Sequence, residues 1–316
     1  KQSKEKQSKG KQSKGKQSKE KQSKGKQYKE KQCSPFKKGK LKDSCLSRES
    51  LIIIAMAIIK DKGIEIDYKH LDNIQLYSKL ETIFRDVYKC KTEACWIHNK
   101  SIKENMSSKD FETLKDYFRP PMPKELVKDF TEWLSNFDIE DVLYKHHRNL
   151  NNFYFYGAVP IDFKKCSVSN DLCKIDILEH KKRSESKLGI VFNTDESNKP
   201  GKHWMAMYVD LDGVNIKDNP GIYFFDSFGS SPSSEIKELI KKIKQQGSKS
   251  GIKFVVAHND KSYQHNTYAC GFYSMHFIEN MLRGNSFDEY LNSGLNDKKM
   301  RRYLNKCFLH PLEIKC

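Results

Sequence analysis

The chain has 316 residues, of which 37% are hydrophobic, enough for one large or two modest domains with buried cores. Its apolar run at residues 51–59 is far shorter than the roughly 20 residues that cross a bilayer, so we expect no membrane span. The net charge of +17 is unevenly placed, because thirteen lysines and three glutamates in residues 1–32 supply +10 of it.

The first 34 residues are a pentad repeat, KQSKE or KQSKG, that decays into KQCSP. The repeat has almost no apolar side chains to offset the entropy cost of ordering, so we predict a disordered tail. Such a tail could hold nucleic acid nonspecifically through its charge, or it could be a solvated extension without a partner. It indicates nothing about catalysis.

Nine cysteines are spread irregularly along the chain, and no apolar leader precedes them. This pattern favours reduced thiols in an intracellular compartment. Cys90, Cys95 and His98 have no second pair of ligands nearby in the sequence, so a zinc site is not expected there. We expect neither a metal nor a cofactor.

Beyond the tail, residues 35–125 are predicted to be a helical arm domain, with apolar residues at helical spacing in 51–59 and 71–89. Three prolines in the segment RPPMPKE, residues 119–125, mark a boundary. Residues 126–316 then mix element types. A helix is capped near Ser135 or Asn136, strands are expected within 152–163, 187–193, 203–213, 221–229 and 251–258, and an amphipathic helix covers 233–247. This order predicts an α+β domain.

The segment SYQHNTYACGFYSMHFIEN, residues 262–280, changes from a polar loop to a helix at Cys270. A lone cysteine is often a small core hydrophobe. At a helix N-terminus, however, unpaired N–H groups and the helix dipole favour the thiolate, which is the nucleophilic form. Gly271 beside it would let a substrate backbone come close. The nucleophile hypothesis requires a histidine base from elsewhere in the chain.

Among ten histidines, His203 is the best candidate for that base, because it opens an apolar strand directly after a loop. His276 follows Cys270 on the same helix but points about 240° away, and His265 has nothing obvious to orient it. Asp226 ends the next strand and can accept a hydrogen bond from the imidazole of His203. Together these residues predict a Cys–His–Asp triad.

Gln264 lies six residues before Cys270, in the loop that leads to the predicted helix. Its side-chain amide can donate a hydrogen bond beside the backbone N–H of Cys270. Two such donors would stabilise a developing oxyanion. Without its neighbours in the sequence, Gln264 would be interpreted as a surface loop residue.

The motifs GKHWMAMYVDLDG, YFFDSFGSSP and QHNTYACGFYSMHFI resemble those of the adenovirus-type and SUMO-protease-type cysteine peptidases. Within that superfamily, WLSNFDIEDVL and NFYFYGAVPIDF resemble the polyprotein-processing proteases of African swine fever virus and related large DNA viruses. The resemblance covers residues 33–316 and implies a papain-like core, with a central mixed sheet, flanking helices and the nucleophile at a helix N-terminus. Asp226 stands where the swine fever virus enzyme has Asn, which should strengthen the cation at His203.

The resemblance also implies a substrate tunnel between two tryptophans. Trp133 matches the Trp of the SUMO-protease WLND motif, and Trp204 matches the Trp that follows the catalytic His. A slot between aromatic faces excludes a Cβ atom, so it would admit only a Gly-Gly stretch of substrate. Asn193 is expected to line the same site. The alternative is that both tryptophans are core residues.

Three functions follow as hypotheses. The first is a monomeric endopeptidase that cuts viral structural polyproteins after Gly-Gly, in the host cytoplasm and in the virion. The second is a deconjugating protease for SUMO or other ubiquitin-like modifiers. The third is a non-catalytic basic protein associated with nucleic acid. The helical arm favours the first, because it resembles the viral group.

Overall fold

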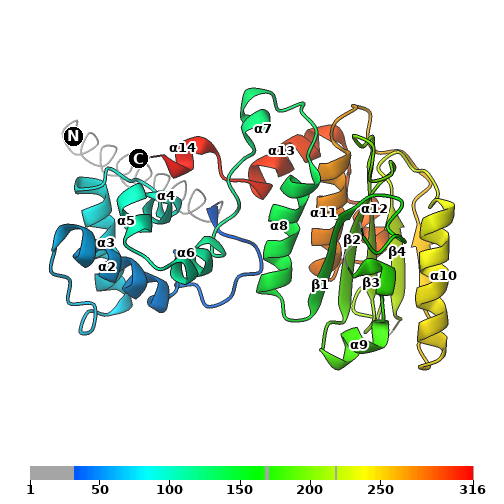
Figure 1. The fold of residues 1–316 in the computed structure, drawn as a ribbon, viewed down its shortest axis with the longest axis horizontal. Helices are drawn as coiled ribbons and strands as arrows, with labels where there is room; N and C mark the ends of the chain where they lie inside the picture. Colours follow the sequence, from blue (N-terminus) through cyan, green and yellow to red (C-terminus); the bar gives the residue numbers. More distant parts are fainter. Residues whose placement is uncertain (1–31, 168–170, 218, 316) are drawn as a thin grey trace, which may run out of the picture. The chain divides into compact units, whose positions relative to one another are not determined.

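The computed structural model describes residues 32–167, 171–217 and 219–315, which form two compact units (Figure 1). One unit contains the described residues up to Pro121 together with those from Leu309 onward. The other runs over Met122–Phe308. The predicted disorder of residues 1–31 falls outside the described residues.

The first unit is helical, as predicted. It contains α2 (Arg48–Lys62), α3 (Asn73–Asp86), α4 (Glu93–His98), α5 (Lys100–Glu104), α6 (Ser108–Lys115) and α14 (Pro311–Ile314). The side chain of Ser47 caps the start of α2, and Gly63 ends it with a left-handed φ of 64°. Leu51, Ile54 and Ile58 of the apolar run are fully buried in this unit's core. No helix within the described ranges is long and apolar enough to cross a membrane.

The borders of this unit differ from the predicted ones at both ends. Residues 32–34, expected in the tail, are part of the unit: Gln32 is buried, and its carbonyl accepts a hydrogen bond from the Arg119 amide at 3.0 Å. Residues from Leu309 onward, expected in the core domain, also belong here. The Leu309 amide donates to the Pro120 carbonyl at 2.8 Å. These borders depend on contacts between segments that are distant in the sequence, which local sequence patterns do not reveal.

A five-stranded mixed sheet forms the centre of the second unit, in the order β1-β2-β3-β4-β5. The strands are β1 (Phe153–Val159), β2 (Lys187–Asn193), β3 (Trp204–Asp210), β4 (Gly221–Phe225) and β5 (Val255–His258). The outer pairs, β1 with β2 and β4 with β5, are parallel, whereas β2 with β3 and β3 with β4 are antiparallel. All five predicted strands are present.

Helices cover the two faces of this sheet (Figure 1). On one side lie α8 (Asn136–Asn149) and α11 (Cys270–Leu282), and on the other lies α10 (Ser234–Ser248). Alternate residues of β2 to β4 pack under α10, including Ile190, Met207 and Phe224. The remaining helices are α7 (Lys124–Lys128), α9 (Ile177–Lys182), α12 (Phe287–Leu291), α13 (Asp297–Cys307) and the 3₁₀ helix η1 (Leu172–Lys174).

The cysteines differ from the sequence-based expectation of reduced thiols. Among the described residues, six cysteines are paired in three disulfides, Cys33–Cys45, Cys90–Cys95 and Cys166–Cys173. The paired Cα atoms lie 5.0, 5.6 and 5.3 Å apart, within the span that a disulfide requires. The expectation is therefore wrong for these six residues, because pairing depends on folded proximity. The cysteines thus no longer indicate a reducing compartment.

Candidate active site

His203 and Asp226 meet at one edge of the central sheet. His203 directly precedes β3, and Asp226 directly follows β4. Because these strands are antiparallel, the start of one lies beside the end of the other, with Ala206 opposite Phe225. Nε2 of His203 lies 2.5 Å from Oδ1 of Asp226. The strand-end placement predicted from sequence brings these two side chains into contact.

The environment of His203 favours its charged form. Burial of the ring alone would favour the neutral form, but hydrogen bonds with Asp226 and Cys270 outweigh it and raise the pKa of His203 to about 9. Burial also acts against the ionised carboxyl, yet the bond to His203 holds the pKa of Asp226 below its usual value. Asp226 is only 1% exposed, so this ion pair is shielded from water. These contacts therefore favour the imidazolium form of His203.

Cys270 is the first residue of α11, as predicted, and it is 1% exposed. No side chain caps the start of this helix, where Ala269 occupies the N-cap position. Because Nε2 of His203 bonds Asp226, Nδ1 is the ring nitrogen left for the thiol. His276 packs its ring edge-on against Tyr303 instead, as its position on the helix requires. The structure thus joins Cys270, His203 and Asp226.

Gln264 is buried in the loop before α11, at 2% exposure, and both ends of its amide are engaged. Oε1 accepts a hydrogen bond from Oγ of Ser227 at 2.7 Å. Nε2 donates to the carbonyl of Asn266 at 2.8 Å. The side chain of Asn266 in turn accepts the amide of Ala269, one residue before the thiol. Gln264 therefore has a defined orientation and is no surface loop residue.

Asn259 and Phe228 support the site and were not identified from the sequence. Asn259, which follows β5, bonds both the backbone amide and the backbone carbonyl of Asp226, at 3.0 and 2.6 Å. Phe228 stacks on His203 with ring centroids 4.8 Å apart, while 44% of it stays exposed. Phe228 could have been suspected, because it stands two residues after Asp226. Asn259 lies 33 residues away, and nothing local signals its role.

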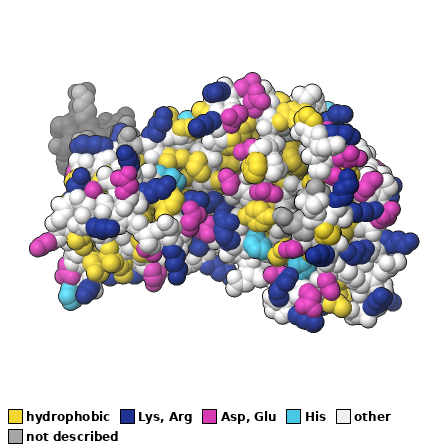
Figure 2. Space-filling view, viewed as in Figure 1, with side chains coloured by type: hydrophobic (Ala, Val, Ile, Leu, Met, Phe, Trp, Pro, Cys, Tyr) yellow, Lys and Arg dark blue, Asp and Glu magenta, His cyan; other side chains and the backbone are white. Residues whose placement is uncertain are grey.

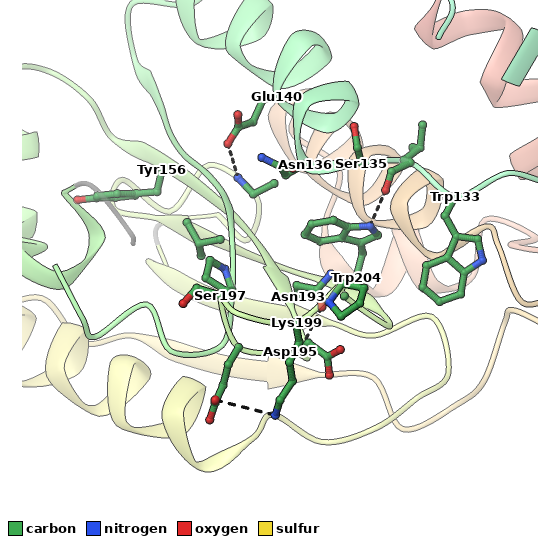
Figure 3. A pocket seen from close by; sticks show the side chains of 17 residues that line it. Trp133, Ser135, Asn136, Glu140, Tyr156, Asn193, Asp195, Ser197, Lys199 and Trp204 are labelled. Carbon is green, nitrogen blue, oxygen red and sulfur yellow. Dashed lines mark hydrogen bonds and ion pairs between the residues drawn. The ribbon is translucent and has the colours of Figure 1, made fainter. Parts of the chain in front are cut away.

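Trp133 and Trp204 line one cavity of about 580 Å³ in the second unit (Figure 3). Trp204 is 7% exposed, and its indole N–H donates to the carbonyl of Leu134 at 2.9 Å. Trp133, in the loop before α8, is 42% exposed and therefore no core residue. A Cβ at Gly271 would lie 3.4 Å from Trp204 and 3.0 Å from Leu134. Leu134 and Trp204, which line the cavity, therefore pack against the first turn of α11.

Asn193, at the end of β2, lines the same cavity. Its Oδ1 accepts the backbone amides of Asp195 at 2.9 Å and Lys202 at 3.2 Å. Gly201 has a φ of +93°, and a Cβ there would lie 2.6 Å from Nδ2 of Asn193. Asn193 therefore also braces the loop that leads into His203.

Known proteins share this architecture. The C-terminal catalytic domain of the Ulp1 protease family matches residues 185–314. A protein of Acanthamoeba polyphaga mimivirus that is named a thiol protease is 31% identical over 220 residues, 68% of this chain and 68% of the relative. A cysteine protease of African swine fever virus is 27% identical over 235 residues, 69% of this chain and 83% of the relative.

The comparison of folds leads to the same group of proteins as the comparison of sequences. The crystal structure of the African swine fever virus protease covers 88% of this chain and 96% of its own, with a TM-score of 0.63 and 22% identity. This likeness confirms the predicted papain-like α+β fold, and the relatives confirm the resemblance inferred from the motifs. The chain belongs to the Ulp1 family of cysteine proteases.

Proposed function

We propose that Cys270, His203, Asp226 and Gln264 are the catalytic residues of an endopeptidase that cuts after Gly-Gly. One observation carries the assignment: His203 contacts the buried carboxylate of Asp226 on one side and the Cys270 thiol on the other. The raised pKa of His203 keeps a proton on the imidazole, where it is available for the leaving amine.

The reaction then follows from these positions. The Cys270 sulfur attacks the carbonyl carbon of the scissile peptide, and the carbonyl oxygen becomes an oxyanion. The backbone N–H of Cys270 and Nε2 of Gln264 donate hydrogen bonds to it. His203 gives its proton to the leaving amine as the C–N bond breaks, which leaves a thioester. Water attacks the thioester, His203 takes the water's proton, and the thiolate is released with the carboxylic acid.

The Gly-Gly preference is supported by the space beside the nucleophile. Trp204 and Leu134 lie against the first turn of α11, where a Cβ added to Gly271 would meet Leu134 at 3.0 Å and Trp204 at 3.4 Å. Trp133 lines the other part of the same cavity and offers an exposed aromatic face. A substrate strand that passes these rings would need residues without side chains next to the scissile bond.

The substrate class is inferred from the relatives, which are proteins of large DNA viruses. We infer that the natural substrates are viral structural polyproteins, cut during virion maturation. That role would place the enzyme, as a monomer, in the host cytoplasm and in the assembling particle.

A peptide panel tests the proposal. Peptides that contain Gly-Gly-X should be cleaved after the second glycine, whereas Gly-Ala-X and Ala-Gly-X should be cleaved at least a hundredfold more slowly. Equal cleavage of all three would overturn the tunnel. A folded SUMO fusion tests the deconjugase alternative, because faster cleavage of the fusion than of an unstructured Gly-Gly peptide would favour that class.

The nucleic-acid alternative has less support in the described residues. Lys and Arg side chains on the visible face are interspersed with Asp and Glu and form no single basic patch (Figure 2). Nucleic-acid contact is therefore proposed only for the basic tail. Salt-sensitive DNA binding without any peptidase activity would favour this alternative over the protease.

A further inference from the structure

Ser227, which directly follows Asp226, is bound to Gln264 through both its side chain and its backbone. Its Oγ donates to Oε1 of Gln264 at 2.7 Å. Its carbonyl accepts the backbone amides of Tyr263 at 2.8 Å and of Gln264 at 3.0 Å. Ser227 is 1% exposed, so water cannot replace these bonds in the folded enzyme.

The hydroxyl of Ser227 and the carbonyl of Asn266 hold the two ends of the Gln264 amide together. A carboxamide has an acceptor oxygen and a donor nitrogen of nearly equal size, so its orientation depends on its hydrogen-bond partners. Ser227 supplies a donor on one side of the amide, and the carbonyl of Asn266 supplies an acceptor on the other. Rotation by 180° would set Oε1 against that carbonyl and would point an acceptor at any oxyanion.

We propose that Ser227 is a positioning residue that holds Gln264 with its N–H groups toward the oxyanion. This inference rests on the proposed role of Gln264 as the oxyanion donor. Nε2 donates to the Asn266 carbonyl at 2.8 Å and lies 3.4 Å from Asn266 Oδ1, and the oxyanion would take the place of the longer of these two contacts. The turn after β4 then serves both halves of the site, because Asp226 orients the base and Ser227 orients the oxyanion donor.

Removing the hydroxyl should weaken catalysis without disturbing the loop. In Ser227→Ala the two backbone bonds to residues 263 and 264 do not depend on the side chain and persist. Oε1 of Gln264 loses its donor, so the amide samples the wrong orientation. We expect a roughly tenfold loss of kcat, the usual size of one lost buried hydrogen bond, with little change in KM.

A double-mutant cycle separates positioning from a general structural effect. Gln264→Ala should lower kcat by roughly a hundredfold to a thousandfold. If Ser227 acts through Gln264, adding Ser227→Ala to that variant should change kcat by less than about twofold. Ser262→Ala is the matched control, since its exposed hydroxyl bonds the Gln264 backbone carbonyl at 3.2 Å rather than the amide. This control should keep kcat.

The pH profile supplies an independent readout. Ser227→Ala should leave the alkaline limit of kcat/KM in place, whereas damage to the neighbouring Asp226 would move it. Two results would overturn the Ser227 inference and leave the Gln264 role intact. The first is an equal loss of kcat when Ser227→Ala is added to the wild-type enzyme and to Gln264→Ala. The second is a shift in the alkaline limit of kcat/KM in Ser227→Ala. The Ser227 inference also fails if Ser227→Ala keeps full kcat while Gln264→Ala does not. Unchanged kcat in Gln264→Ala would overturn the oxyanion role and the Ser227 inference together.

Discussion

Replacing Asp226 by Asn should move the alkaline limit of activity to lower pH. The imidazolium of His203 donates its proton to the leaving amine, so activity should fall as pH rises through the pKa of His203. That pKa is raised from 6.5 to about 9, although burial of the ring acts against the charge. Asn can still hold the ring in place, but it removes the negative charge that stabilises the imidazolium.

The size of the effect follows from these values. The difference between about 9 and 6.5 corresponds to roughly 3 kcal/mol of net stabilisation of the charged ring. Without the carboxylate at 2.5 Å, the pKa of His203 should fall from about 9 toward its ordinary value of 6.5. Near pH 8 the variant would then lose roughly tenfold in kcat/KM, while near pH 6 the loss would be smaller. The raised pKa of His203 extends activity to alkaline pH. A lower pKa in the variant therefore shifts the alkaline limit of activity to lower pH.

The assay is the pH dependence of kcat/KM on a Gly-Gly peptide, together with an NMR titration of the His203 ring. Asp260→Asn is the matched control, because it removes an exposed carboxylate near the same loop. It should leave the alkaline limit unchanged. An Asp226→Asn enzyme whose limit stayed near pH 9 would refute the reasoning, since the carboxylate would then not support the imidazolium.

Cys270→Ala should abolish cleavage while the thermal unfolding temperature stays similar, whereas Cys307→Ala should keep substantial turnover; near-normal turnover in Cys270→Ala would remove the basis of the proposed site. Gly271→Ala should lower kcat/KM several-fold, because the new Cβ lies 3.0–3.1 Å from two atoms of Leu134. An unchanged kcat/KM would show that Leu134 can move away without harm to catalysis. Trp204→Ala should lower kcat/KM for Gly-Gly peptides and narrow the discrimination against Gly-Ala, and retained discrimination in the peptide panel would count against the tunnel. Deleting residues 1–31 should keep peptide turnover within a few-fold while it weakens DNA binding and flattens its salt dependence in a titration, and failure of the truncated chain to fold would contradict the predicted disorder.

Local pattern in the sequence was enough to predict the elements and to single out the proposed site residues. Alternating and continuous apolar runs identified the five strands, and the change from polar loop to apolar helix placed Cys270 at the start of α11. His203 and Asp226 were recognisable because each stands where an apolar strand meets a loop. The motif order then indicated the family, which the relatives confirm.

The tertiary structure decided what depends on contacts between distant segments. Sequence reasoning assigned residues 309–316 to the wrong unit and took six paired cysteines to be reduced, because neither a domain border nor a disulfide is a property of one segment. Asn259 and Ser227 were missed for the same reason: their roles exist only through bonds to Asp226 and Gln264 across the fold. Residue type and local spacing determine which chemistry a side chain can perform, whereas the orientation of a buried amide or imidazole is set by partners that only folding brings within reach.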